Sequence, residues 1–319
     1  MEVSMGKIYD GIIGVAIGDA LGVPVEFIDR EQLTKAPITA MIGYGTHMQP
    51  PGTWSDDTSL TLALLDSISQ KHGIDYRDIM NKFSEWMLYN EYTATGKIFD
   101  IGNATSRAIM NYGRGYEPLV CGGITKYENG NGSLMRILPI AFYFDAQPNL
   151  SMDSRIELIH NLSSLTHRHP ISMIGCGIYI CIALKLLSEK ISLIDGIRLG
   201  IEEAFFYYEN LKSNDISEYN RLKNVTEFAN LSHNQIKSTG YVVHTLEAAL
   251  WCLLNSDSYK TCVLKAINLG DDTDTIAAVA GGLAGIYYGA KNIPQEWLTT
   301  LLKRDYIENL CTTFESTFS

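Results

Sequence analysis

The sequence predicts an all-α protein, a compact multi-helix domain that extends over residues 1–319. Apolar residues recur at positions i, i+3 and i+4 along most of the chain, which is the spacing of a helix with one buried face. The strict apolar–polar alternation of a half-buried strand is hard to find. Because neither a low-complexity linker nor a repeat of solenoid period interrupts the chain, we expect all helices to share one apolar core.

Eleven segments carry the helical spacing. They cover residues 9–22, 57–71, 76–90, 104–112, 152–166, 171–188, 193–209, 241–254, 259–268, 275–290 and 294–303. Gly73 follows the second segment and Pro294 opens the last, as is usual at helix ends. Polar or Gly/Pro-rich composition predicts two loops and a surface excursion, at residues 37–51, 117–131 and 213–231. The segment 275–290 contains closely spaced glycines, at positions 281, 282, 285 and 289. They indicate that other helices pack closely around this segment.

The composition excludes several classes of protein. A hydrophobic content of 46% and a charged content of 19% are typical of a soluble globular chain. The net charge of -11 argues against nucleic-acid binding, which needs clustered Lys and Arg, and suits a protein that binds cations. The six cysteines form neither a CxxC pair nor a Cys/His ligand spacing, so we expect free thiols in a reducing cytoplasm.

Neither a signal peptide nor a membrane span is expected. The N-terminal residues lack a basic region before the first apolar stretch. The longest uncharged, mostly apolar runs, residues 171–184 and 276–289, have 14 residues each. A spanning helix needs about 20. Because no exposed heptad or edge strand is evident, we also expect a monomer.

Residues 268–275 read NLGDDTDT and place three carboxylates in four positions before an apolar helix. On a helix, Asp272 and Asp274 would point about 200° apart. They converge only if the backbone there is still extended, so we place residues 270–274 in the turn and N-cap before a helix from Thr275. The positive helix end tolerates this charge. Capping needs a single Asp, however, so it does not explain the other carboxylates, whose negative charges repel one another.

Two further acidic sites lie at junctions between helix and loop. Residues 51–58, PGTWSDDT, repeat the Asp-Asp-Thr order at a helix start, and Glu26 follows the first helix. Capping or a solvated surface explains each site alone. Gathered at one point, five carboxylates suit two Mg²⁺ or Mn²⁺ ions, which prefer hard oxygen ligands. The expected metal ligands are Ser55, Asp56, Asp57, Asp272, Asp274 and Thr275.

Other α-helical metal-binding classes fit the sequence less well. A terpenoid-synthase-like diphosphate enzyme wants Asp-Asp-x-x-Asp, but position 60 is Leu and position 275 is Thr. An HD-type phosphohydrolase needs a His-Asp dipeptide, which the sequence lacks. An EF-hand counted from Asp272 needs Gly at its sixth position, where Ala277 stands.

Seven motifs, in order between about residue 7 and 290, resemble the ADP-ribosylglycohydrolase family. They are GVAIGDALGVPVEF, GTWSDDTSL, IGNATSRAIMNYG, NGNGSLMRILPIAF, LTHRHP, GYVVHTLEAALW and LGDDTDTIAAVAGGLAGIYYG. The resemblance implies a binuclear Mg²⁺ or Mn²⁺ centre and an enzyme that removes ADP-ribose from ADP-ribosylated proteins. Residues 55–57 and Asp272, Asp274 and Thr275 correspond to its two metal-binding triplets. Two departures are Asp271, where the family commonly has Gly, and Ser55, where Thr is frequent.

The resemblance also implies catalytic and substrate-binding residues. Glu26 or Asp57 would activate water, and the sequence does not choose between them. Asp100 would meet the substrate guanidinium, because a carboxylate pairs with guanidinium bidentately. The alternative for Asp100 is that it caps the next helix. The other expected substrate-side residues are Asn103, Gly132, Ser133, Met135, His167 and Tyr241.

Simpler local explanations exist for three of these substrate-side features. Residues 129–133 can form a plain turn instead of placing N–H groups at the diphosphate. His167 can be structural, and Tyr241 can pack in the core instead of stacking on adenine. The expected activity is cleavage of ADP-ribosyl-arginine. The alternatives are hydrolysis of O-linked ADP-ribose (on serine, or as O-acetyl-ADP-ribose) and an inactive ADP-ribose-binding relative.

Overall fold

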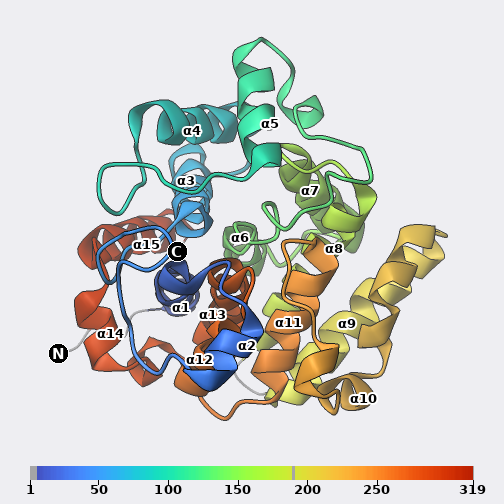
Figure 1. Ribbon diagram of the computed structural model, residues 1–319. Coiled ribbons are helices and arrows are strands. Elements are labelled where there is room, and N and C mark those ends of the chain that lie inside the picture. The colour runs from blue at the N-terminus through green and yellow to red at the C-terminus, as the bar shows by residue number, and fades with distance from the viewer. Residues whose placement is uncertain (1–5, 189–190, 319) are drawn as a thin grey trace.

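The computed structural model describes residues 6–188 and 191–318, and helices dominate it (Figure 1). Within these ranges no β-strand forms, and three isolated bridges join Tyr44 to Gln49, Gly123 to His167, and Gly130 to Tyr241. The all-α prediction is therefore confirmed. Residues 1–5, on which the expected absence of a signal peptide partly rests, lie outside the described ranges.

Each of the eleven predicted segments contains a helix. The α-helices are α1 (Lys7–Gly22), α2 (Arg30–Lys35), α3 (Asp56–Lys71), α4 (Tyr76–Tyr89), α5 (Asn103–Gly113), α6 (Pro139–Ala146), α7 (Met152–Ser164), α8 (Pro170–Leu187), α9 (Leu193–Asn210), α10 (Val225–Ala229), α11 (Val242–Leu254), α12 (Tyr259–Ile267), α13 (Thr273–Tyr288), α14 (Gln295–Thr300) and α15 (Arg304–Phe318). Short 3₁₀ turns are η1 (Val23–Val25), η2 (Pro118–Val120), η3 (Asn214–Lys223), η4 (His233–Gln235) and η5 (Ala290–Asn292).

Four α-helices were not predicted, namely α2, α6, α10 and α15. Three of them have eight residues or fewer, too few to show a period. The expected surface excursion at 213–231 is wrong in part, because it forms η3 and α10 and buries apolar side chains. These are Ile216, Tyr219, Leu222, Val225 and Phe228. This segment therefore belongs to the core as well as to the surface.

Helices α1 and α13 lie side by side at the centre of the molecule, as expected from the glycines (Figure 1). A Cβ on Gly18 would lie 2.1 Å from the carbonyl oxygen of Ala277, and one on Gly22 would lie 2.3 Å from Asp274 Cα. Only glycine permits this approach. The Thr273 hydroxyl closes the contact by donating to the Gly22 carbonyl at 2.9 Å. The start of α13 is thereby held against the end of α1.

The buried apolar side chains form one continuous cluster. This agrees with a single domain over residues 1–319, which stays a prediction. The six cysteines are all buried free thiols. Burial raises the pKa of Cys262 to about 12, so that thiol stays protonated at neutral pH.

Two helical stretches are long and apolar enough to span a membrane, Lys7–Val25 and Pro170–Leu187. Both stretches are longer than the uncharged runs counted in the sequence because each contains at least one charged residue, such as Asp19 in the first and Lys185 in the second. In the folded chain 89% and 72% of these stretches is buried, which is the environment of a core helix. Their length and composition are therefore weak evidence for a membrane protein, and the absence of a membrane partner stays a prediction.

Candidate active site

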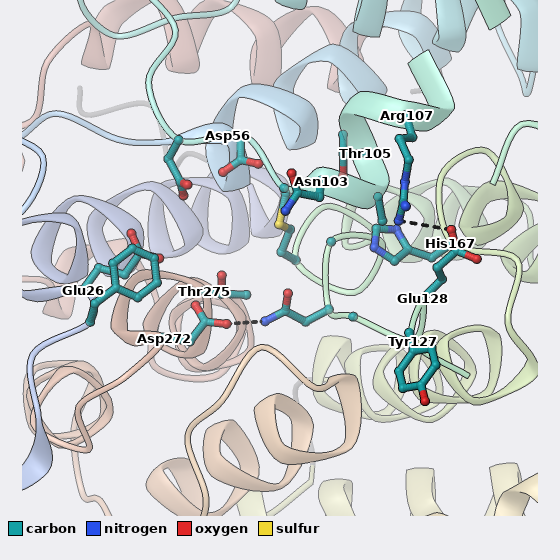
Figure 2. Close-up of a pocket in the computed structure, with 18 residues that line it drawn as sticks. Glu26, Asp56, Asn103, Thr105, Arg107, Tyr127, Glu128, His167, Asp272 and Thr275 are labelled. Carbon is teal, nitrogen blue, oxygen red and sulfur yellow. Dashed lines mark hydrogen bonds and ion pairs between the residues drawn. The ribbon is translucent and has the colours of Figure 1, made fainter. Parts of the chain in front are cut away.

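A pocket of about 310 Å³ brings together six separate parts of the chain. Figure 2 shows the residues that line it. Its walls come from the residues after η1, the first turn of α3, the residues before α5 together with its first two turns, the loop before α6, the residues after α7 and the start of α13. Acidic residues gather at one end, where Glu26, Asp56 and Asp272 lie, while Tyr127 and Glu128 lie at the other (Figure 2). Acids predicted from three distant motifs thus share one cavity.

The first acidic triplet lies at the start of α3. Ser55 is the N-cap, and its hydroxyl accepts the Asp57 N–H at 3.3 Å. Asp56 and Asp57 occupy the first turn and are buried. Burial and the surrounding carboxylates raise the pKa of both groups well above the usual range. Such groups are unfavourable as anions unless a positive charge compensates them.

The second acidic cluster lies at the start of α13, which begins at Thr273 and not at Thr275 as predicted. Asp272 is a non-helical N-cap, and Asp274 is already in the first turn. Their carboxylates nevertheless converge, because oxygens of Asp272, Asp274 and Glu26 all lie within 4.8 Å of one another. Asp271 is exposed and accepts the Ser238 hydroxyl at 3.2 Å, so it does not disturb this cluster.

The two clusters meet at Asp57 and Thr275, whose hydroxyl lies 3.4 Å from Asp57 Oδ2. Asp57 Oδ1 and Asp274 Oδ2 are buried and have no hydrogen-bond partner within the described part of the chain. Buried polar atoms are rarely left unpaired, since this costs free energy. Divalent cations bound by oxygen ligands would satisfy both atoms. The donor set therefore fits divalent cations.

Asp100 faces the acidic end of the pocket and does not cap α5. The N-cap of that helix is Gly102, and no side chain caps it. Asp100 adopts a left-handed backbone with φ of 47°, which aspartate tolerates better than most residues and which is typical of functional sites. Its carboxylate groups with Glu26 and His47, with one atom of each within 4.8 Å of the others. The capping alternative for Asp100 is therefore wrong.

His47 contacts the second oxygen of Glu26 through Nε2. This hydrogen bond raises the pKa of His47. Burial raises the pKa of Glu26 to about 7 against the opposing effect of His47, and Asp100 and Asp272 add to the rise. Glu26 is thus held between one histidine and the acidic cluster.

Four of the expected substrate-side residues line the pocket, namely Asn103, Gly132, Met135 and His167. A Cβ on Gly132 would lie 2.7 Å from His167 Cε1, so the loop rests directly on the imidazole ring. Burial and the charge of Arg136 lower the pKa of His167 to about 3, and Thr166 bonds its Nδ1 at 2.8 Å. His167 therefore offers the pocket a neutral ring.

Ser133 and Tyr241 do not line this pocket. The Ser133 hydroxyl is buried and accepts from Ser163 at 2.9 Å. The Tyr241 hydroxyl donates to Glu218 at 3.2 Å, and its ring packs edge-on against His244 at 5.0 Å. Substrate contact by these two residues stays a prediction.

Several residues of the site were not singled out in the sequence. Asp19 carried a recognisable pattern, as the only acid between Asp10 and Glu26 in a continuous apolar helix. Asn131, whose amide donates to Asp272 Oδ2 at 2.6 Å, lies in a motif already quoted. Arg107 follows Asn103 by one helical turn, a spacing that places both on one face. His47 comes from a Gly/Pro-rich loop, where no pattern marks it.

Comparisons with known proteins show which chains this one is similar to. Residues 3–318 match the family described as ADP-ribosylglycohydrolase. The ADP-ribosylarginine hydrolase Tri1 of Serratia proteamaculans is 32% identical over 307 residues, which cover 96% of this chain and 78% of that protein. The ADP-ribosyl-[dinitrogen reductase] glycohydrolase of Rhodospirillum rubrum is 29% identical over an alignment that covers 91% of this chain and 88% of that protein. A solved ADP-ribosylglycohydrolase-related protein complex superposes with a TM-score of 0.76 at 29% identity, covering 99% of both chains.

Proposed function

Because the chain belongs to the ADP-ribosylglycohydrolase family, we propose that it hydrolyses the N-glycosidic bond of ADP-ribosyl-arginine and releases ADP-ribose from modified proteins. The observation that carries the proposal is the convergence of Glu26, Asp56, Asp100 and Asp272 on one pocket. In addition, Asp57 and Asp274 each have a buried carboxylate oxygen that lacks a hydrogen-bond partner among the described residues. A relative named for arginine hydrolysis supports the linkage.

Two divalent cations, Mg²⁺ or Mn²⁺, are the proposed cofactors. Their proposed ligands are Ser55, Asp56, Asp57, Asp272, Asp274 and Thr275. When bound, such ions would orient the ribose hydroxyls and lower the pKa of a water molecule. The buried oxygens Asp57 Oδ1 and Asp274 Oδ2 support this assignment, because neither has a hydrogen-bond partner in the described part of the chain and a cation would compensate their charge.

Between the two candidates for activating water, Glu26 is favoured over Asp57. Glu26 lines the pocket, whereas Asp57 is not among the lining residues and its Oδ2 lies beside the Ser55 and Thr275 hydroxyls. A general base must reach the proton that it abstracts, and its pKa should lie near the working pH. Glu26 meets the first condition because it lines the pocket, and in the metal-free protein burial raises its pKa to about 7. His47 then holds the carboxylate in place.

Asp100 is proposed to receive the arginine guanidinium, which a carboxylate binds with two parallel hydrogen bonds. Its place beside Glu26 puts the leaving group next to the water-activating residue. The backbone of the loop at residues 130–132, held on the neutral His167 ring, is proposed to bind the diphosphate. We further propose a cytoplasmic monomer that acts on ADP-ribosylated proteins without nucleic-acid or membrane partners.

The test is the release of ADP-ribose from two matched conjugates, one linked through arginine and one through serine. Each is incubated with Mg²⁺ and with EDTA. Metal-dependent cleavage of the arginine conjugate is the expected result. Cleavage of the serine conjugate alone would assign the enzyme to O-linked substrates. If neither is cleaved while ADP-ribose still binds, the chain is an inactive ADP-ribose-binding relative.

A further inference from the structure

Arg107 is the one pocket-lining residue with a permanent positive charge in the described part of the chain. Five lining residues are acidic, namely Glu26, Asp56, Asp100, Glu128 and Asp272. His167 also lines the pocket, but its imidazole is neutral. Any anionic part of a ligand in this pocket therefore has one side chain that can attract it.

The guanidinium of Arg107 is paired with Glu128, at 3.1 Å from Nη2 to Oε1. Glu128 has other partners, because its Oε2 accepts the Thr125 N–H at 3.1 Å and the Thr125 hydroxyl at 2.8 Å. These bonds hold Glu128 in place with or without Arg107. The Arg107 side chain is 58% exposed, and ion pairs of such exposure contribute little stability. Arg107 can therefore change partner at little cost.

Arg107 and Glu128 lie at the end of the pocket away from Glu26 (Figure 2). A substrate whose reacting ribose occupies the acidic end extends its diphosphate toward the opposite end. Like charges repel the diphosphate from the acidic cluster, and a guanidinium matches phosphate oxygens in a fork of two hydrogen bonds. We propose that Arg107 leaves Glu128 and binds the diphosphate of the substrate. This inference rests on the proposed function.

The test measures binding of ADP-ribose, the expected product, to the Mg²⁺-loaded protein by isothermal titration calorimetry. Replacing Arg107 by Ala should raise the Kd by about 10- to 100-fold, the range expected for losing a hydrogen bond to a charged group. Arg107→Lys keeps the positive charge but cannot form the fork of two hydrogen bonds. Its Kd should therefore lie between those of the wild type and Arg107→Ala. Arg114→Ala removes the same charge at the other end of α5 and should leave the Kd unchanged.

Glu128→Gln separates phosphate binding from a structural role for the ion pair. Glutamine still accepts from Thr125, while Arg107 no longer has to leave an anion, so ADP-ribose should bind as tightly or more tightly. Equal weakening by Glu128→Gln and Arg107→Ala would overturn the proposal, and so would an unchanged Kd in Arg107→Ala. Adenosine, which has no phosphate, should bind wild type and Arg107→Ala alike; a matching loss would show disruption of the pocket instead.

The outcomes for this residue and for the proposed function are distinguishable. If the wild type binds ADP-ribose through Arg107 but spares the arginine conjugate, the proposed linkage fails and the phosphate contact stands. If the wild type cleaves the conjugate and Arg107→Ala binds ADP-ribose normally, only the contact fails. A metal-loaded wild type that binds no ADP-ribose would overturn both.

Discussion

The carboxylate of Asp19 and the backbone of Ser55 are joined by two hydrogen bonds, with the Ser55 N–H 2.9 Å from Oδ1 and 3.0 Å from Oδ2. The N–H and hydroxyl of Thr58 also donate to Oδ2, at 3.0 Å and 2.6 Å. Asp19 is completely buried in α1. A side chain of the central helix thus fixes the helix start from which Asp56 and Asp57 project.

Replacing Asp19 by Asn should weaken Mg²⁺ binding by about 10- to 100-fold, the usual effect of losing a residue that orients metal ligands, because one acceptor becomes a donor that faces the N–H groups of α3. The unfolding free energy should fall by about 1–3 kcal/mol, the usual effect of leaving buried polar groups unpaired. Calorimetric Mg²⁺ titration and thermal denaturation give the two values. Asp66→Asn is the matched control, since Asp66 is a buried acid of α3 that pairs with Lys82. It should lower stability and spare metal affinity.

Gly22 sets the distance between α1 and the second acidic cluster, because a Cβ there would lie 2.3 Å from Asp274 Cα. Gly22→Ala should lower the unfolding free energy by about 1–3 kcal/mol, as overpacking does. It should also weaken Mg²⁺ binding by displacing Asp274. Gly113 lies in α5, and a Cβ added there would have no atom within 4 Å. Gly113→Ala should therefore raise the unfolding free energy by up to about 1 kcal/mol. Equal effects of the two substitutions on thermal denaturation would contradict this account.

The helices and acidic clusters could be predicted because their causes are local. Apolar spacing indicated α1 and α13, and surplus carboxylates at two helix starts indicated cations. The exact start of α13 could not be predicted, because the Asp272 N–H donates to the carbonyl oxygen of Ser238 at 3.0 Å, a residue far away in sequence. Its neighbour Asp271 takes a left-handed backbone with φ of 60°.

The parts of the fold and site that were not predicted depend on tertiary contacts or on where one helix ends and the next begins. The spacing of Ile307, Cys311 and Phe314 is helical, but α15 follows α14 after a turn at Lys303, whose φ is 52°. Nothing in the sequence around His47 indicates a neighbour 21 residues away, yet folding places it against Glu26. Local patterns therefore predicted ligands and helices, whereas partners across loops required the structure.

Asp100 should matter for arginine-linked substrates and not for the metal ions. Asp100→Asn keeps the size of the side chain and tolerates the left-handed backbone. It should lower kcat/KM for the arginine conjugate by about 10- to 100-fold, because a charge-assisted pair with guanidinium is lost. Mg²⁺ affinity should stay unchanged, and Asp100→Ala should behave in the same way. Parallel losses of metal binding and hydrolysis would contradict the assignment.

The metal-free protein should become less stable as pH rises from about 4.5 to about 7, through the titration of Glu26. Burial raises the pKa of this carboxyl from 4.5 to about 7, so the folded state binds its proton more tightly than the unfolded chain does. The contribution of Glu26 to the unfolding free energy is therefore largest at low pH, and it is lost as the carboxyl of the folded protein ionises. In EDTA, the Tm of the wild type relative to Glu26→Gln should therefore fall across this interval. If the Tm difference between the wild type and Glu26→Gln stays constant or rises with pH, the proposed link between Glu26 ionisation and stability is wrong.

Adding Mg²⁺ should reverse this trend, because the ions bind ionised carboxylates and stabilise the folded state by mass action. The rise in Tm caused by Mg²⁺ should thus be small near pH 5 and should grow toward pH 8. Asp274→Asn removes a buried charge whose Oδ2 lacks a hydrogen-bond partner in the described chain, and it should reduce the rise at every pH. In EDTA at pH 8 the same variant should be more stable than the wild type, since a neutral amide does not have to be buried as an anion. Lower stability of Asp274→Asn in EDTA at pH 8 would mean that the carboxylate is compensated within the protein itself and does not need a cation.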